Sequence, residues 1–356
     1  MKICYFGIYD PEYARNQVLM MGLRENGVEV VECRVDPKKY SGFSKYWQLL
    51  HEGFQLKKRR MFDVVIVGFP GQSVYWIACL LWGKKAIIDM FLSLYDTNVL
   101  DRRLYTGWGM RGLRDWFYDW YSAHLVSCIL LDTNEHITYI TKAFGVSVKK
   151  FIRVPVSANP EIFRPLPMPP HTNFVVGFTG MFSPLHGAQY IIEAAKILRE
   201  HADITFTLVG SGQDEKNIFK LIQKYKLESS VNCLPAVPQE QLPRIIAGFD
   251  ICLGIFGASE KAARVIPNKF YQYAAMQKPI ITANTPALQE YFVDNQHYLG
   301  CRAADGKDLA EKILKLYSDR GFSGTISKNV YEYYCKNLQP KSIVNELIAS
   351  LSKHEI

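Results

Sequence analysis

Two runs of alternating strand-like and helix-like segments are the feature that most restricts what this sequence can fold into. In the first run, short apolar segments typical of buried strands lie at residues 2–8, 28–33, 63–67, 86–88 and 125–131. Helix-like segments separate them, such as the amphipathic stretch at 14–26 that stops at Gly27. Strands that alternate with helices form a parallel sheet covered on both faces, so this half predicts one Rossmann-like α/β domain.

A proline-rich segment interrupts the alternation. The stretch SANPEIFRPLPMPPHTN, counted together with Pro155, holds six prolines and few signals of regular structure, which is typical of a linker. Strand-like segments resume at residues 174–179, 204–209, 231–234, 251–256 and 279–282. We therefore predict an α/β protein with two Rossmann-like domains, at 1–165 and 166–338, and a C-terminal segment at 339–356 that is helical from about 341 to 353.

Composition limits the classes of partner. The 356 residues are 48% hydrophobic and 13% aromatic, which is enough for two hydrophobic cores and excludes a disordered or fibrous chain. A net charge of +8 favours an anionic partner, such as a nucleotide, a phospholipid headgroup or a nucleic acid. Because no known nucleic-acid-reading module is present, we do not expect nucleic acid to be the partner.

No segment of the sequence predicts a membrane span or a cleaved leader. The opening residues MKICYFGIYD are typical of a strand and a turn, and the longest apolar stretch, at 73–82, is too short to cross a bilayer. The eight cysteines are far apart and lack a Cys-x-x-Cys pair, which is typical of reduced core residues in the cytosol. We expect a cytoplasmic protein that meets a membrane, at its inner face, only peripherally.

The segment at 250–282 carries the strongest functional signal. It is predicted to form a strand, a loop, a short helix and a second strand, so the loop opens at the carboxyl edge of the sheet, where α/β proteins bind ligands. Glycine and proline beside several cations predict an anion site, because a helix start presents free amides. The alternative is an ordinary solvated basic face. The residues concerned are Gly257, Lys261, Arg264, Asn268 and Lys269.

Two glycine-containing turns in the second domain resemble phosphate loops in their layout. Gly180 and Gly187 lie between a strand and a helix, and Gly210 with Gly212 follows the next strand. Glycine allows a ligand to approach the backbone, and the amides of the following helix point at an anion. A tight strand-to-helix turn without any ligand would give the same pattern.

These motifs resemble those of a known enzyme family. The letters LGIFG, followed by VIPNK and then KPIIT, resemble the donor-sugar loop of family-four retaining glycosyltransferases with the GT-B fold, especially those of bacterial polysaccharide synthesis. RVPVSANPEIFRP and DMFLSLYDTNVLDRR also resemble stretches of that family. The resemblance implies two Rossmann-like domains facing a central cleft, with the C-terminal helix crossing back to the first domain.

The resemblance also implies a donor site and a chemistry. Lys261, Arg264 and the Gly180–Gly187 loop with His186 would stabilise the departing diphosphate of a UDP- or GDP-linked sugar. Such cations replace a metal ion, and the chain has no Asp-x-Asp motif, so we expect neither a metal nor another cofactor. The donor-binding residues implied are Gly180, Met181, Gly187, Gly210, Val237, Phe256, Gly257, Asn268, Lys269 and Gln272.

Four positions depart from the family pattern. Gln272 stands where relatives carry a glutamate thought to hold the ribose, and Arg264 where many have a second glutamate. Met181 replaces an arginine, and His186 a lysine. Glutamine still hydrogen-bonds hydroxyls but lacks the charge of a strong acceptor. Gln272 and Met181 therefore suggest an alternative to the enzyme, a catalytically weakened nucleotide-sugar-binding partner subunit. A sugar-nucleotide epimerase, which shares the fold but normally has more acidic residues in the cleft, is a further alternative.

The first domain is expected to bind the acceptor. Arg15 and Asn16, at a helix start after the first strand, could hold an acceptor phosphate, although Arg15 could also simply face solvent. Asp89, Asp96 and Asp101 follow the strand at 86–88, and any of them could orient or deprotonate an acceptor hydroxyl. Asp89, directly at the strand end, is the first choice as the catalytic base, and Asp101 could instead cap a helix.

Two aromatic stretches suggest a lipid. Residues 44–60 are helix-like, with Trp47, Leu50 and Phe54 toward one side and a basic end, and residues 108–120 are rich in aromatics and arginines. Both could be ordinary amphipathic helices packed on a sheet. A glycan acceptor linked to a polyisoprenoid, and peripheral contact with a membrane, would account for them.

Overall fold

The computed structural model describes residues 1–353 and divides the chain into two compact units. Unit 1 consists of Met1–Ser157 and the chain from Leu338 on, and unit 2 is Ala158–Asn337. The first division falls before the proposed 165/166 boundary. Ser157 donates a hydrogen bond to the carbonyl of Leu338 in unit 1, whereas the next residue, Ala158, accepts one from Tyr334 of unit 2. Residues 354–356, at the end of the proposed third segment, lie outside the described residues.

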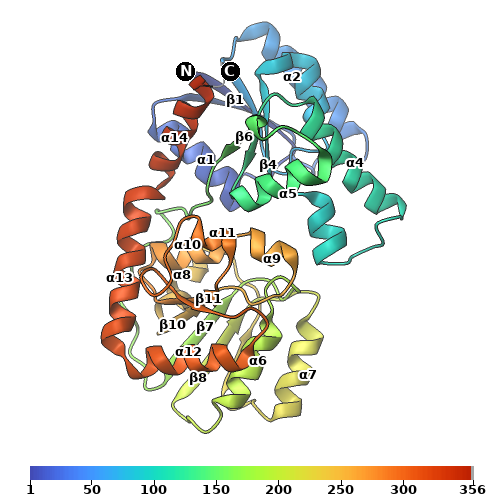
Figure 1. Cartoon of the computed structure of the whole chain (residues 1–356). Helices are drawn as coiled ribbons and strands as arrows, with labels where there is room; N and C mark the ends of the chain where they lie inside the picture. The colour runs from blue at the N-terminus through green and yellow to red at the C-terminus, as the bar shows by residue number, and fades with distance from the viewer. Residues whose placement is uncertain (354–356) are drawn as a thin grey trace. The chain divides into compact units, whose positions relative to one another are not determined.

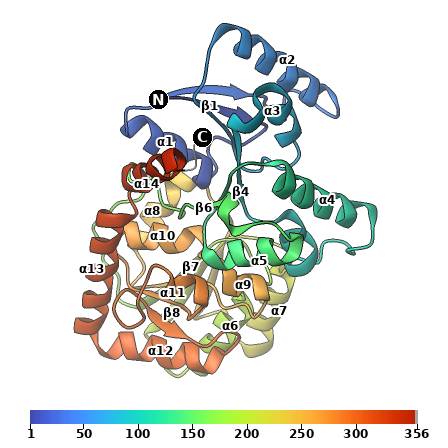
Figure 2. The ribbon, with the colours of Figure 1, turned by 45° about the horizontal axis from the view of Figure 1, so that its top comes forward.

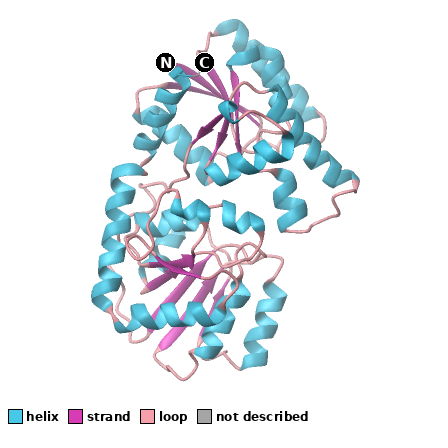
Figure 3. Ribbon diagram, viewed as in Figure 1, coloured by secondary structure: helices cyan, strands magenta, loops and turns pink. Residues whose placement is uncertain are grey.

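Unit 1 is built on one parallel sheet with the strand order β2-β1-β3-β4-β5-β6 (Figures 1 and 3). Its strands are β1 (Lys2–Gly7), β2 (Glu29–Arg34), β3 (Val64–Val67), β4 (Ala86–Phe91), β5 (Ile129–Leu131) and β6 (Phe151–Arg153). Its helices are α1 (Ala14–Glu25), α2 (Ser44–Arg59), α3 (Tyr75–Trp82), η1 (Gly83–Lys85), η2 (Asp96–Asp101), α4 (Met110–Leu125), α5 (Asn134–Phe144), η3 (Val148–Lys150) and α14 (Pro340–Lys353).

Unit 2 repeats this plan with the strand order β12-β11-β10-β7-β8-β9. Its strands are β7 (Phe174–Thr179), β8 (Ile204–Val209), β9 (Val231–Leu234), β10 (Ile251–Leu253), β11 (Ile280–Ala283) and β12 (Leu299–Cys301). Its helices are α6 (Ala188–Ile197), α7 (Glu215–Tyr225), η4 (Gln239–Gln241), α8 (Leu242–Ala247), α9 (Glu260–Arg264), α10 (Asn268–Ala275), α11 (Pro286–Gln289), α12 (Gly306–Ser318) and α13 (Arg320–Asn337). The predicted pair of Rossmann-like α/β domains is confirmed.

Burial on both faces explains why the strands are almost uniformly apolar. In β1, Cys4 and Phe6 enter one apolar cluster, while Ile3 and Tyr5 enter another on the opposite face of the sheet. Every residue of β3 and β4 is buried. Parallel strands covered by helices on both sides lose the polar alternation of a half-exposed sheet.

Two strand ends differ from the sequence prediction. The strand expected at 86–88 continues to Phe91, because Met90 is also buried, and Asp89 therefore lies inside β4 rather than in a loop. The strand expected at 251–256 ends at Leu253. The chain stays beside β11 for two more residues, because the Gly254 amide donates to the Ile281 carbonyl and the Ile255 amide to the Thr282 hydroxyl. Both differences bear on the candidate site.

The helix α14 lies along α1 within unit 1, as Figures 1 and 2 both show. Ile343, Val344 and Leu347 enter the same apolar cluster as Leu19 and Leu23 of α1. The two helices meet where α1 has a glycine. A Cβ atom on Gly22 would lie 2.3 Å from the Pro340 carbonyl oxygen and 2.5 Å from a methyl group of Val344. A side chain at residue 22 would therefore separate the helices.

None of the helices within residues 1–353 is both long enough and apolar enough to cross a lipid bilayer.

We expect Gly22→Ala to lower the free energy of unfolding by roughly 1–3 kcal/mol, because the added methyl group overpacks the contact between α1 and α14. Thermal unfolding followed by circular dichroism measures the effect. Gly324→Ala is the matched control, since a Cβ there meets no atom within 4 Å and alanine suits the helix α13 better than glycine. An equal response of the two variants would contradict the tight contact.

Candidate functional site

Three loops at the carboxyl edge of the unit 2 sheet pack backbone against backbone. They follow β7, β8 and β10. A Cβ on Gly210 would lie 1.9 Å from the Gly180 carbonyl oxygen, and one on Gly187 would lie 2.6 Å from the Gly257 nitrogen. Gly187 also has a φ of +62°, in the left-handed region that favours glycine. Only glycine allows these loops to approach so closely.

Backbone hydrogen bonds join the same loops into one layer. The Phe256 amide donates to the carbonyl of His186 at 3.0 Å, and the Gly257 amide to that of Leu185 at 3.1 Å. The Phe182 amide donates to the Ser211 carbonyl at 2.9 Å. The chain that follows β10 is thus fixed by the loop that follows β7. The predicted glycine loops therefore form one interconnected edge of unit 2.

His186 and Lys269 both approach Gly180. The His186 Nδ1 lies 2.8 Å from the Ser183 hydroxyl, while its Nε2 is 3.9 Å from the position that a Gly180 Cβ would take. The Lys269 ammonium nitrogen lies 2.9 Å from that same position and 3.5 Å from the centre of the Phe178 ring. A glycine here leaves room for both side chains beside the loop.

The side chain of Lys269 is buried beside the Gly180 loop. Only 5% of the residue is exposed, and its ammonium group forms no hydrogen bond with any residue of the described chain. Burial lowers the pKa of Lys269 well below its ordinary value, because the charged form loses water without gaining a countercharge. An anion bound at this glycine loop would supply the missing countercharge and favour the protonated form of Lys269.

Two further cations come from the short helix α9. Lys261 and Arg264 are both buried, and the Ser259 hydroxyl caps the helix by accepting from the Ala262 amide at 3.2 Å. Arg264 also forms an ion pair of 3.3 Å with Glu260, whose carboxylate is exposed to solvent. A pair of this kind is screened by water and contributes little to stability. The predicted basic cluster is thus largely buried, not a solvated face.

The remaining predicted donor residues lie on α10, in the loops themselves or in the segment after β9. Asn268 and Gln272 are one turn apart on α10, and Gln272 is buried. Phe256 is buried and takes part through its backbone, whereas Met181 is exposed beside Gly212. Val237 is half-buried in the segment after β9. The structure therefore gathers Gly180, His186, Gly187, Gly210, Phe256, Gly257 and Lys269 at one edge.

We expect Lys269→Met to raise the free energy of unfolding of the ligand-free protein by roughly 1–3 kcal/mol at neutral pH, because it removes a buried donor without a partner. Methionine can keep the contact with the Phe178 ring. The gain should shrink as the pH rises, since the wild-type protein then sheds the Lys269 proton more readily when folded than when unfolded. Urea denaturation at neutral and alkaline pH measures both effects.

The same variant should weaken the binding of nucleotides, which a purely structural lysine would not do. Lys220→Met, an exposed change on α7, is the matched control for stability and for binding. Equal stability of Lys269→Met and wild type at every pH would contradict a buried charge at residue 269.

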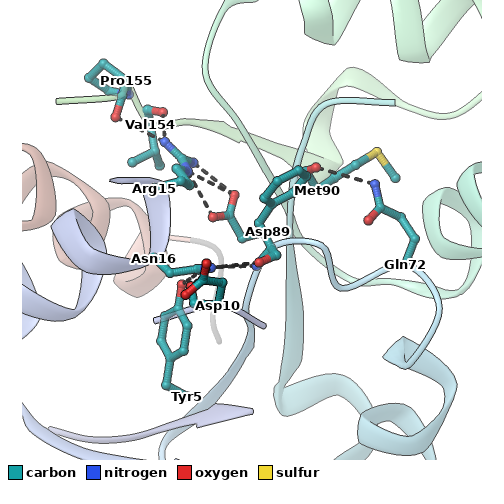
Figure 4. A network of polar contacts seen from close by, with 10 residues as sticks. Tyr5, Asp10, Arg15, Asn16, Gln72, Asp89, Met90, Val154 and Pro155 are labelled. Atoms are coloured by element: carbon teal, nitrogen blue, oxygen red, sulfur yellow. Dashed lines mark hydrogen bonds and ion pairs between the residues drawn. The ribbon is translucent and has the colours of Figure 1, made fainter. Parts of the chain in front are cut away.

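In unit 1, the predicted acceptor residue Arg15 is bound to the predicted base Asp89 (Figure 4). The guanidinium Nε lies 2.9 Å from one carboxylate oxygen, and the terminal nitrogen NH2 lies 3.0 Å from the other. NH1 donates to the carbonyl oxygens of Val154 and Pro155, at 2.6 and 3.1 Å. Both side chains are inaccessible to solvent. Burial alone would lower the pKa of Arg15, but the Asp89 carboxylate outweighs it and raises that pKa, whereas burial outweighs Arg15 at Asp89 and raises the pKa of the carboxyl group.

The side chain of Asn16 also forms its hydrogen bonds within unit 1. Its side-chain oxygen accepts from the Tyr5 hydroxyl, and its nitrogen donates to the Asp10 carbonyl (Figure 4). The same oxygen accepts from the Phe69 amide, and the nitrogen donates to the Phe69 carbonyl. The sequence predicted Arg15 and Asn16 at a helix start and Asp89 at a strand end, with all three available to the acceptor. The structure instead uses them to join α1 to the sheet, because Asp89 lies inside the buried strand β4. Their arrangement favours a structural role.

Asp96 and Asp101 both lie in η2 and are buried. The Asp96 amide donates to the Ser93 hydroxyl at 2.9 Å. Sequence reasoning missed the carboxylate that organises this loop, Asp119 of α4. It accepts from Ser93 and from the amides of Leu94 and Tyr95. Burial raises the pKa of Asp119 to about 7. An acid on the apolar face of a predicted helix was the signal available in the sequence.

A second polar pair was also missed. Asp132 directly follows β5, and its carboxylate lies 2.5 Å from Nδ1 of His136 in the first turn of α5. Both side chains are buried, and Nε2 of His136 forms no hydrogen bond with any of residues 1–353. The spacing of four residues across a helix start, directly after a strand, could have revealed the pair. It lies one strand away from Asp89 in the sheet.

We expect Asp89→Asn to lower the free energy of unfolding by about 3–5 kcal/mol, because Arg15 would stay buried without its countercharge. The double variant Arg15→Met, Asp89→Leu should recover much of that loss, since two apolar side chains of similar size leave no buried charge. Chemical denaturation of the three proteins measures this. A variant Asp89→Asn that keeps its stability but loses turnover would instead restore the prediction that Asp89 acts on the acceptor.

Comparison with known proteins agrees with the geometry of unit 2. Residues 161–333 match the family model described as glycosyl transferases group 1. No curated protein sequence matches the chain closely enough to count as a relative. This segment is therefore a group 1 glycosyltransferase domain, and it accounts for nearly all of unit 2.

Solved structures extend the likeness to the whole chain. HepE of Anabaena, in complex with UDP, is 14% identical, with a TM-score of 0.72 over 99% of this chain and 100% of that one. Sucrose-phosphate synthase of Thermosynechococcus elongatus is 13% identical, with a TM-score of 0.76 over 99% of this chain and 98% of that one. TarM of S. aureus is 14% identical, with a TM-score of 0.63 over 85% of this chain and 58% of that one.

The chain thus has the GT-B fold, and its second unit is a glycosyltransferase domain of group 1. The predicted GT-B fold is confirmed, and residues 161–333 match the predicted class of protein.

Proposed function

We propose that the protein is a retaining glycosyltransferase of the family-four type, which moves a sugar from a nucleotide diphosphate to a glycan acceptor. The observation that carries the proposal is the buried cation Lys269 beside the glycine loops of unit 2, where its ammonium has no hydrogen-bond partner in the described chain. A phosphate oxygen would accept the hydrogen bond that the Lys269 ammonium does not make within the described chain. The group 1 domain supplies the class of reaction.

The charge arrangement suits the departure of a diphosphate. Negative charge grows on the leaving group in the transition state, and preorganised cations and backbone amides stabilise it there. Lys261, Arg264, Lys269 and His186 would supply these groups together with the loop Gly180–Gly187. Because side chains already provide the positive charge, we propose that the reaction requires no metal ion or other cofactor.

Gln272 and Asn268 are the proposed partners of the nucleotide sugar's hydroxyl groups. Both side chains combine a donor with an acceptor and lie one helical turn apart on α10. UDP is the first nucleotide to test, since HepE has been solved with UDP and with UDP-glucose. GDP is the second. Gln272 would bind hydroxyls without the charge of a carboxylate.

We propose a glycan acceptor, carried by a lipid and used at the cytoplasmic face of a membrane. TarM has been solved with UDP and with glycan ligands, fondaparinux and α-GlcNAc-glycerol. In this chain, the exposed aromatic residues of α2 and α4 support the lipid. Asp96 and Asp101 remain the proposed acceptor residues, whereas the buried pair of Arg15 and Asp89 would fix the framework behind them.

We expect a thermal-shift panel of UDP, GDP, ADP and their sugar conjugates to raise the melting temperature of the protein with one nucleotide class, because a ligand that binds only the folded state stabilises it. Turnover of the matching sugar conjugate should then be detectable as slow hydrolysis or as transfer to a glycan. Arg264→Met should reduce this turnover by about 10²-fold, since one charge on the leaving group is lost.

Arg199→Met is the matched control, because Arg199 is an exposed arginine of unit 2 that pairs with Glu200. Activity should persist in the presence of a metal chelator. Nucleotide binding without turnover, in both the wild type and Gln272→Glu, would favour a binding partner subunit over an enzyme. The lack of any nucleotide binding would exclude the donor site itself.

A further inference from the structure

Most of the exposed aromatic surface of the described chain lies on one part of unit 1. Five of the chain's six tryptophans are substantially exposed, and all five belong to α2, α3, α4 or the segment leading into α4. Trp108 is 91% exposed and Trp47 is 73% exposed. Neighbouring apolar side chains are exposed as well, and the set is Phe43, Trp47, Phe54, Trp76, Leu80, Trp108, Met110, Leu113, Trp116, Phe117, Trp120 and Leu125. We call this set the aromatic face.

The aromatic face has two hollows, and α2 lines both of them. One hollow of about 870 Å³ lies between α2, α3 and α4, whose positions in unit 1 are visible in Figure 2. A second, of about 390 Å³, lies between α2 and α3. Trp47 and Leu50 line both hollows. No acidic residue lines either one, and nearly all the lining side chains are aromatic or aliphatic.

The charged groups bordering this face are mostly basic. The helix α2 ends in Lys57, Lys58 and Arg59, all exposed, and the Lys58 ammonium lies 4.4 Å from the centre of the Phe54 ring. Arg111 and Arg114 of α4 are exposed too. The acids of α4, Asp115 and Asp119, are buried and accept hydrogen bonds within unit 1. Arg114 pairs with Asp115 at 2.7 Å, and Glu52 of α2 is half-buried, so the net positive charge beside the aromatic face comes from Lys57, Lys58, Arg59 and Arg111.

We propose that the aromatic face is a docking surface for a lipid bilayer that contains anionic phospholipids. Tryptophan and tyrosine are favoured at the boundary between headgroups and acyl chains, and lysine and arginine beside them attract anionic headgroups. The hollows flanking α2 would receive the ends of acyl chains. The bilayer is favoured over a second copy of the chain, because pairing two such faces would bring basic borders together.

This inference rests on the proposed function, since a lipid-linked acceptor has to be reached at a membrane. It also adds to that function, because it names the surface and the headgroup charge. The proposed function and the proposed docking surface can be disproved independently of each other. Nucleotide binding and sugar turnover test the donor site of unit 2, whereas vesicle binding tests the aromatic face of unit 1.

The test is co-sedimentation of the full chain with vesicles of phosphatidylcholine, with and without one third phosphatidylglycerol. We expect the wild type to sediment with the anionic vesicles and to be released by high salt. Trp47→Glu with Trp108→Glu should weaken this binding by about tenfold or more, because two interfacial side chains become anionic. Both residues are exposed, so the melting temperature should not change.

Phe219→Glu is the matched control, since Phe219 is an exposed aromatic residue on α7 of unit 2. It should bind the anionic vesicles as the wild type does. Lys57→Gln with Arg59→Gln should reduce the binding to anionic vesicles and lessen its sensitivity to salt.

Three outcomes would overturn the inference. The first is a wild type that turns over its sugar donor but does not sediment with either vesicle. The second is equal binding of neutral and anionic vesicles. The third is a lipid-free dimer, detected by analytical ultracentrifugation, that the double tryptophan variant abolishes, because the face would then bind a second copy of the chain.

Discussion

Close contact between glycine backbones is the constraint on which unit 2 depends. The Gly180 carbonyl touches Gly210, and Gly187 touches the amide of Gly257, so a Cβ at residue 210 or 187 would push the loops apart. The same contact also opens the space beside Gly180 that the side chains of Lys269 and His186 approach. The packing of the fold and the geometry of the site are therefore one feature.

The two units treat buried charge in opposite ways. In unit 1, Arg15 is matched by the Asp89 carboxylate and by two backbone carbonyls, so every part of its charge has a partner. In unit 2, the Lys269 ammonium rests on an aromatic ring alone. A satisfied pair adds rigidity, whereas an unsatisfied cation costs stability until an anion arrives. This contrast favours unit 2 as the seat of anion binding. The exposed aromatic face of unit 1 suits a different partner, one with an apolar interior and a charged surface.

Local sequence signals predicted the β/α order, the linker and the glycine loops well, because hydrophobic periodicity and glycine both act within a few residues. They failed where the role of a residue depends on a partner that is distant in the sequence. Asp89 was predicted at the end of a strand, but β4 continues past it to Phe91. Arg15 and Asn16 were predicted to be available to an acceptor, but their side chains bond to groups distant in the sequence. Asp119 and the pair of Asp132 with His136 were missed because their partners, or their burial, arise from tertiary packing.

The sequence by itself determined the alternation of strands and helices, the two α/β units and the residue types available for holding an anion. Tertiary structure decided which of those residues are used in the framework and which are held at the edge of the sheet. The physical reason is that the state of a charge depends on its surroundings. A carboxylate 2.9 Å from an arginine is satisfied, and a lysine enclosed without a partner is not. Neither condition can be read from the neighbours of a residue in the chain.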